Sequence, residues 1–281
     1  MDWARIKNIL IILFLIINIF LCAFVYISRQ EEKNIYNETA DKIIAILEKQ
    51  DIILDKKNIP QSMKNMKSCY IDRIIQSEQS FIQNIMGEYH IAGEGSYVNQ
   101  YKSLTITAGD IDFKDTTVRQ ETINLSAMSA ADINRYCKQN ITKYGISLNG
   151  TIFKGINVIG DNRKAIFSYQ YDKYDIIDAY VTVELSANGI SRIQGKNIIT
   201  HGFLVDEQIK VIPLFDILLD FPNNPQLNKS RKVEIINITQ GYYIGKGAES
   251  YKSLVAIPVH QIVTDDGNMY HYDARNASFI E

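Results

Sequence analysis

An uninterrupted apolar run near the start of the chain constrains it more than any other feature. From Ile9 to Ile27 there are nineteen residues without a charge, and Asn18 is the one strongly polar side chain among them. As a helix, at about 1.5 Å per residue, this run is about 28 Å long, close to the roughly 30 Å of hydrocarbon in a bilayer. We therefore expect a single helix that crosses a membrane, within an N-terminal segment 1–29.

A cleaved signal peptide and a lipoprotein are the alternatives to a retained anchor. A signal-peptide core usually has about 7–15 residues and ends at a small-x-small site, whereas residues 24–28 read FVYIS, with bulky side chains. A lipoprotein would be modified at Cys22, but the bulky Phe20 and Leu21 precede it where that route needs a small residue. We predict an uncleaved signal anchor, with the lipoprotein as the alternative.

The basic residues that flank the run do not decide its orientation. Arg5 and Lys7 precede it, and Arg29 and Lys33 follow it, so the positive-inside count is even. A short tail, an anchor and then a long polar domain are typical of a signal anchor with a cytoplasmic N-terminus. We therefore expect the residues after the span to lie outside the cytoplasm.

The composition is that of a globular protein. Of 281 residues, 46% are hydrophobic and 22% are charged, which is ordinary for a packed domain. The formal net charge is −2, and residues 1–29 carry +2 of it, so the rest of the chain is acidic, at −4. An acidic exported domain lacks the basic surface that nucleic-acid binding needs.

Three cysteines are too few for a disulfide framework. Cys22 falls in the apolar run, while Cys69 and Cys137 lie far apart in the sequence. One Cys69–Cys137 bridge is conceivable, but we favour two buried free thiols.

Hydrophobic spacing after the anchor predicts a mixture of helices and strands. Residues 37–50 predict an amphipathic helix with Ala40, Ile43, Ile46 and Leu47 on one face, residues 70–86 a second short helix, and 89–115 strands. A third helix begins at Ser126 or Ser129, with Asp132 as a capping partner, and stops at Gly145.

Strands then follow twice, each time after a helix. The first set is expected at 150–158, 164–171, 175–186 and 190–199. A helix at 205–221, around Pro213, precedes the second set, expected at 232–244, 252–263 and 268–273. We therefore predict an α+β fold of repeated lobes, each a helix packed on an antiparallel meander: an N-terminal extracytoplasmic region at 30–123, then lobes at 124–200 and 201–281.

No stretch of the chain carries the pattern of a catalytic or metal site. The four histidines lack metal-ligand spacing, and residues 244–247 (IGKG) lack the rest of a phosphate-binding loop. Residues 264–270 (TDDGNMY) resemble the start of a calcium loop without its closing glutamate, so a β-turn is favoured. We expect no enzyme activity, no cofactor, no metal and no small-molecule ligand.

Asn18 is the most informative polar residue of the span. Phe14, Asn18 and Cys22 lie one helical turn apart, so they form a stripe that could contact a second membrane helix. An amide that bonds only within its own helix is an equally good interpretation.

Two groups of residues at the ends of the chain carry a family resemblance. The first group is Asp2, Trp3, Arg5, Lys7 and residues 18–21 (NIFL). The second group is Gly241, Tyr242, Tyr243, Pro258, Val259, Ile262, Asp266, Gly267, Tyr270, Tyr272 and Ala274. With these residues, and in its length and layout, the chain resembles the YycI (WalI) family. One departure is His260, which stands where the family commonly has an aromatic residue such as Trp.

The resemblance implies a single-pass membrane protein of low-GC Gram-positive bacteria with a regulatory, non-enzymatic extracytoplasmic domain. Its partners would be a sensor histidine kinase of the YycG (WalK) type and a YycH (WalH)-like regulator, contacted in part through membrane helices. Two other classes stay open: an exported cell-wall or peptide-binding module, anchored by lipid, and an exported hydrolase.

Overall fold

The computed structural model describes residues 3–60, 63–74, 79–107, 109–118, 122–245 and 253–280. The chain divides into two compact units. The first unit comprises Met1–Met63, Pro213–Ile238 and Ile262–Met269, and the second comprises Lys64–Ile212, Thr239–Gln261 and Tyr270–Glu281. Helices and an antiparallel-rich sheet are both present, so the predicted α+β class is confirmed at this level.

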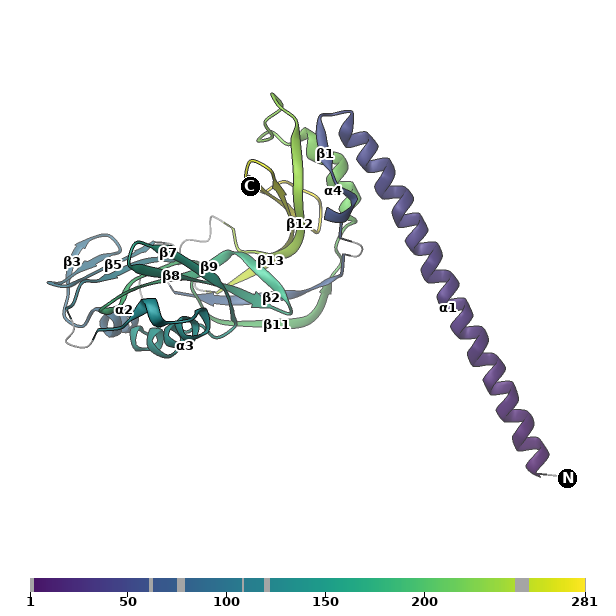
Figure 1. Ribbon diagram of the computed structural model, residues 1–281, viewed down its shortest axis with the longest axis horizontal. Helices are drawn as coiled ribbons and strands as arrows, with labels where there is room; N and C mark the ends of the chain where they lie inside the picture. The colour runs from purple at the N-terminus through teal and green to yellow at the C-terminus, as the bar shows by residue number, and fades with distance from the viewer. Residues whose placement is uncertain are drawn as a thin grey trace. The chain divides into compact units, whose positions relative to one another are not determined.

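The apolar run and the predicted helix 37–50 are parts of one helix, α1 (Trp3–Glu48), drawn as a single long coil in Figure 1. Its N-terminal part is long and apolar enough to cross a membrane. Neither Gly nor Pro occurs between Trp3 and Glu48, and these two residues cause most breaks in helices. The span therefore continues without interruption into the next segment of the chain.

The C-terminal turns of α1 help to build the core of the first unit. They pack on β1 (Ile52–Leu54), on the 3-10 turn η1 (Lys56–Asn58) and on α4 (Leu214–Asp220). Ala40, Ile43 and Leu47 are buried, as predicted, whereas Ile46 is 39% exposed. Tyr36 packs on Phe215 with ring centroids 5.3 Å apart, and its hydroxyl donates to the Pro60 carbonyl at 2.8 Å.

Strands complete the first unit. β1 runs parallel to the start of β12 (Val233–Tyr243), with Ile52 opposite Val233 and Leu54 opposite Ile235. Another 3-10 turn, η4 (Phe221–Asn223), follows α4 and buries Phe221 completely.

Most strands of one large sheet belong to the second unit, with two helices on one face (Figure 1). The strand order is β11-β2-β13-β12-β9-β10-β6-β5-β4-β3, with β7 paired to β8, β8 to β9 and β14 to β13. The strand bounds are β2 Met66–Arg73, β3 His90–Gly93, β4 Ser96–Val98, β5 Lys102–Thr107, β6 Asp110–Asp115, β7 Thr151–Ile159, β8 Asn162–Tyr171, β9 Tyr174–Ser186, β10 Gly189–Lys196, β11 Ile199–Ile209, β13 Ser253–Thr264 and β14 Met269–Asp273.

Helices α2 (Gln79–Met86) and α3 (Ala130–Asn140) cover the apolar face of this sheet. Ser129 is the N-cap of α3 and forms a capping box with Asp132, as predicted. Buried residues of both helices, such as Ile85 and Cys137, belong to one core with Phe113 and Phe167 of the sheet. The 3-10 turns η2 (Leu125–Ala127) and η3 (Ile141–Tyr144) flank α3, and Gly145 ends η3 with a positive φ of 72°.

The predicted strands of both helix-then-strand sets are confirmed to within a few residues, and so are the turns at Asn188–Gly189 and Asp265–Asn268. Two helix predictions were partly wrong. Residues 205–209 of the expected helix 205–221 belong instead to β11, which pairs with β2, and α4 begins only after Pro213, its N-cap. Residues 66–73 form β2, and α2 covers residues 79–86 of the expected helix 70–86.

Gly241 allows a close approach between parallel strands β12 and β9. It lies opposite Asp175, and a Cβ atom there would be 2.8 Å from the Asp175 carbonyl oxygen and 2.8 Å from Ile177 Cδ1. The backbone oxygen cannot move aside without disturbing the ladder.

We predict that Gly241→Ala lowers the free energy of unfolding by about 1–3 kcal/mol through this overpacking. Gly93→Ala is the matched control, because nothing lies within 4 Å of a Cβ at that strand position. Chemical denaturation of both variants checks this, and equal stabilities would show that the β9–β12 contact can relax.

Candidate interaction sites

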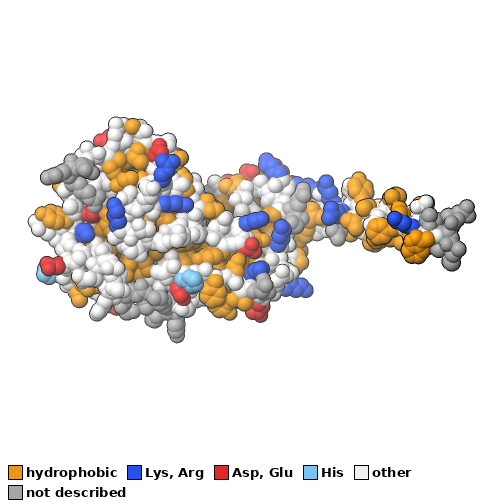
Figure 2. Space-filling model, turned by 90° about the horizontal axis from the view of Figure 1, so that it is seen from below, with side chains coloured by type: hydrophobic (Ala, Val, Ile, Leu, Met, Phe, Trp, Pro, Cys, Tyr) orange, Lys and Arg blue, Asp and Glu red, His pale blue; other side chains and the backbone are white. Residues whose placement is uncertain are grey.

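The predicted membrane stripe lies on the exposed surface of α1. Phe14 is 70% exposed, and Cys22 is an exposed free thiol. Asn18 Nδ2 donates to the Phe14 carbonyl oxygen at 2.8 Å, so the amide does bond within its own helix. Its side-chain oxygen and second amide hydrogen have no partner among the described residues. Apolar side chains crowd this part of α1 in Figure 2.

The structure describes one of the first two family-type residues and not the other. Trp3 is the first residue of α1 and is 78% exposed, while Asp2 lies outside the described residues.

Most family-type residues near the C-terminus are core residues, whereas Asp266 and Gly267 lie in an exposed turn. Tyr242, Tyr243, Pro258 and Ile262 are all buried. The Tyr242 hydroxyl donates to the Lys67 carbonyl at 2.7 Å, and burial raises the pKa of this phenol. Tyr243 stacks on His271 with ring centroids 5.2 Å apart. The motif therefore marks packing and main-chain contacts.

His260 is completely buried in β13, in the place where the family commonly has an aromatic residue. Neither ring nitrogen has a hydrogen-bond partner among the described residues. Burial lowers the pKa of His260 to about 4, against a smaller opposing contribution from the Ile212 backbone. At neutral pH the imidazole ring is therefore uncharged, and it occupies space in the core as another aromatic ring would.

The remaining cysteines are free and buried, as predicted. Burial raises the pKa of Cys69 and of Cys137 to about 12, so neither thiol is a nucleophile.

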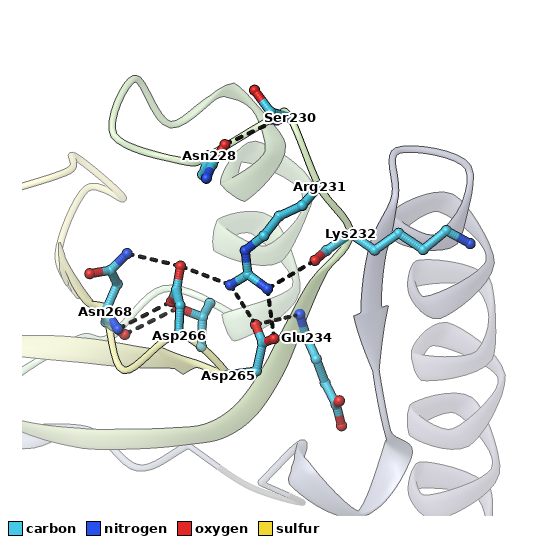
Figure 3. Close-up of polar contacts among 9 residues, drawn as sticks. Asn228, Ser230, Arg231, Lys232, Glu234, Asp265, Asp266 and Asn268 are labelled. Atoms are coloured by element: carbon cyan, nitrogen blue, oxygen red, sulfur yellow. Dashed lines mark hydrogen bonds and ion pairs between the residues drawn. The ribbon is translucent and has the colours of Figure 1, made fainter.

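The carboxylates of the Thr264–Tyr270 turn are bonded to neighbouring residues of the protein (Figure 3). Arg231 binds Asp265 with both terminal nitrogens, at 2.7 and 3.0 Å, and Asp266 at 2.9 Å. Asp266 also accepts from the Thr264 hydroxyl at 2.6 Å and from the backbone and side chain of Asn268 at 3.2 and 3.0 Å. The turn is confirmed, and its acids already have partners. Among the described residues, no three His, Cys, Asp or Glu side chains gather as metal ligands would.

Sequence reasoning missed a buried polar cluster in the second unit. Asp178 is 5% exposed and accepts hydrogen bonds from the backbone of Ile244 and Gly245, both at 2.9 Å. Asn197 donates to the Asp178 carbonyl at 3.1 Å and accepts from Arg73 at 2.8 Å. Burial raises the pKa of Asp178 in spite of its donors. The one sequence signal was an Asn inside the predicted strand 190–199: Asn197 follows the end of β10 with a φ of 46°, which Asn tolerates well.

A row of exposed apolar side chains crosses three neighbouring strands of the second unit. Tyr70 of β2 lies between Phe203 of β11 and Val255 of β13. The three side chains are 38%, 49% and 46% exposed, and the Tyr70 and Phe203 rings stack at 5.4 Å. Apolar side chains grouped on a folded surface mark contact sites more often than scattered ones do.

A polar groove of about 360 Å³ lies on strands β5, β6, β8, β9 and β10. At one side of the groove, the Arg192 guanidinium donates two hydrogen bonds to the Asp112 carboxylate, at 2.8 and 2.6 Å. The Lys164 ammonium donates to the Gln194 side-chain oxygen at 3.1 Å. Several of its polar groups thus already satisfy one another. A peptide-binding or wall-binding module would use such a groove, but it would first have to break these pairs.

No family model and no curated protein sequence matches this chain. Among solved structures, an uncharacterized protein from Eubacterium rectale matches with 13% identity and a TM-score of 0.50, over 82% of this chain and 91% of that one. The C-terminal domain of Bacillus megaterium YpeB matches with 9% identity and a TM-score of 0.36, over 75% of this chain and 97% of that one. The first likeness is one of fold alone, and the second is too distant for any argument.

We predict that Thr264→Val raises the pKa of Asp266 more than Arg231→Gln does. The pKa of Asp266 is lowered to about 2, first by the Thr264 hydroxyl and then by Arg231. Because folding lowers it, Asp266 stabilises the turn above its unfolded pKa of about 3.9, and this contribution is lost as the pH falls toward 2. Carboxyl chemical shifts during an acid titration measure each pKa, with Arg163→Gln as control because Arg163 donates to backbone carbonyls. The reverse order of effects would contradict the assignment.

His260→Phe should stabilise the protein, and more so in mild acid. The parent buries two ring nitrogens without partners, which costs about 1–3 kcal/mol. The unfolded imidazole also takes up a proton below about pH 6.5, whereas the folded ring resists protonation down to a pKa of about 4. Stability is therefore lost as the pH falls from 6.5 to 4, and Phe removes that loss. Unfolding midpoints at pH 7 and pH 5 test this, with the exposed His90→Phe as control. A stability difference that does not change with pH would refute the buried neutral ring.

Proposed function

We propose that this protein is a membrane-anchored regulator that acts on a sensor histidine kinase of the YycG type by protein–protein contact, together with a YycH-like partner. The proposal rests on the resemblance at both chain ends and on the architecture of the anchor. In this proposal the N-terminus is cytoplasmic, both units are extracytoplasmic, and neither catalysis nor a cofactor is involved.

The observation that carries the proposal is the continuity of α1. A protein that only needs to stay at the membrane can use a flexible linker after its anchor, whereas here the helix that spans the membrane is also part of the packed core of the first unit. Such a helix can pass a displacement in the membrane to the folded unit, or the reverse. Regulation of a membrane kinase by an exported protein needs a connection of this kind.

Asn18 supplies the second support. Its partner-free amide groups lie within the apolar span, where burying a polar group without hydrogen bonds is costly. A second helix with a hydrogen-bonding side chain at the same depth would satisfy them. We also take the helix-and-meander segments 124–200 and 201–281 to be repeated lobes, as their sequence pattern predicts.

We predict that Asn18→Leu weakens association of the full-length protein with the kinase or the YycH-like regulator by roughly five- to thirtyfold, from the loss of about 1–2 kcal/mol. In-membrane energy transfer between labelled chains measures the association. Ile16→Leu is the control, because position 16 lies about 200° around the helix from Asn18.

The outcomes separate the sites. Failure of the parent to associate with either protein would overturn the proposed function. Association that is unchanged by Asn18→Leu would move the contact from the span to the exported units, where the Tyr70, Phe203 and Val255 row is the surface to alter next.

A further inference from the structure

The angular register of α1 can be followed from the membrane span to the packed core. The helix holds 46 residues with no Gly, no Pro and no positive φ, so each residue adds about 100° of rotation and about 1.5 Å of rise. Figure 1 draws it without a visible kink. The direction of any side chain therefore fixes the direction of all the others.

Two faces of α1 are defined by independent observations. Tyr36, Ala40, Ile43 and Leu47 form the packed face: the last three are buried, and Tyr36 contacts Phe215 and the Pro60 carbonyl. The membrane face is centred on Asn18, whose amide keeps hydrogen-bonding capacity. Nothing about the packing of the first unit requires the two faces to share a direction.

The packed face and the membrane face nevertheless point in the same direction. At about 100° per residue, Asn18 and Cys22 point within about 20° of Leu47, on either side of it, although they precede it by about eight and seven turns. Ile11, Val25 and Arg29 fall within about 40° of the same line and are exposed. Phe14 lies about 60° away, at the margin. One straight stripe thus joins the unsatisfied amide to the core contact.

We propose that this stripe is a single docking line, so that a second membrane helix meets α1 on the side that also carries α4 and β1. The occupant is a transmembrane helix of another protein with a hydrogen-bonding side chain in mid-membrane, which Asn18 selects. Because both contacts lie on one line of a rigid helix, rotation of α1 against its membrane partner turns the packed face by the same angle.

This inference rests on the proposed function and refines it. The proposed function requires only that the span and its partner associate. The inference adds that the phase between Asn18 and Leu47 must be preserved for the span and the exported units to engage a partner together.

Alanine insertions after Gln30 test the phase in the full-length, membrane-embedded chain. One or two alanines rotate the span by about 100° or 200° relative to the packed face, whereas four or seven bring it back to within about 40° or 20°. The probes are a YycG-type kinase and a YycH-like regulator labelled for energy transfer. We expect one or two alanines to weaken association five- to thirtyfold, as Asn18→Leu does, and four or seven to restore it to within about threefold.

Two controls exclude a merely structural cause. The melting temperature of each insertion variant should equal that of the parent, because residues 36–48 and their partners are untouched. In an Asn18→Leu background the insertions should have no further effect, since the phase matters only through that amide.

Each outcome has a distinct meaning. If the parent associates and all four insertions weaken association equally, or if none of them weakens it, the docking line is overturned while the proposed function stands. Absence of association by the parent overturns the proposed function itself. Restoration by four and seven alanines, but not by one and two, supports the docking line.

Discussion

The structure depends first on what hydrocarbon does to a polypeptide backbone. Without water, every N–H and C=O of the span must bond within its own segment, and a helix achieves this. Asn18 obeys the same rule, since its amide donates to the Phe14 carbonyl one turn earlier. With no Gly or Pro to stop it, the helix whose N-terminal part is long and apolar enough to cross a membrane continues as far as Glu48. In its C-terminal turns Ala40, Ile43 and Leu47 are buried, so this end of the helix is part of the core of the first unit.

The second unit meets a comparable constraint inside protein. A buried carboxylate is costly unless donors surround it, and Asp178 recruits two backbone N–H groups and the Asn197 amide. Asn197 in turn accepts from Arg73, which is 2% exposed. Residues of β2, β9 and the β10–β11 turn are tied together by this cluster. Polar groups, as well as apolar packing, therefore fix how the strands meet.

The sequence predicts those elements that local chemistry determines. Ser129 and Asp132 predict the capping box, Asn188–Gly189 and Asp265–Asn268 predict their turns, and alternation predicts β7 to β10. It failed where a strand depends on a distant partner. Residues 205–209 were expected to begin a helix, but pairing with β2 makes them the end of strand β11. Asp178 could not be predicted for the same reason, because its backbone donors Ile244 and Gly245 lie 66 and 67 positions away in the sequence.

The candidate site shows the same difference between what local spacing predicts and what depends on distant residues. The stripe of Phe14, Asn18 and Cys22 could be read from spacing alone, whereas its alignment with the packed face needed the helix to be seen as continuous.

The buried C-terminal motif shows what the family resemblance can support. Gly241 is required by a close strand contact, and Tyr242 by a hydrogen bond to the Lys67 carbonyl. Pro258 and Ile262 are buried in β13. Residues of this kind specify an architecture and not a binding partner. Even His260, the visible departure, sits in the core as a neutral ring and does not alter an exposed surface. In the proposed function, the partner is therefore selected by exposed residues outside this buried motif: the amide of Asn18 and the row through Tyr70.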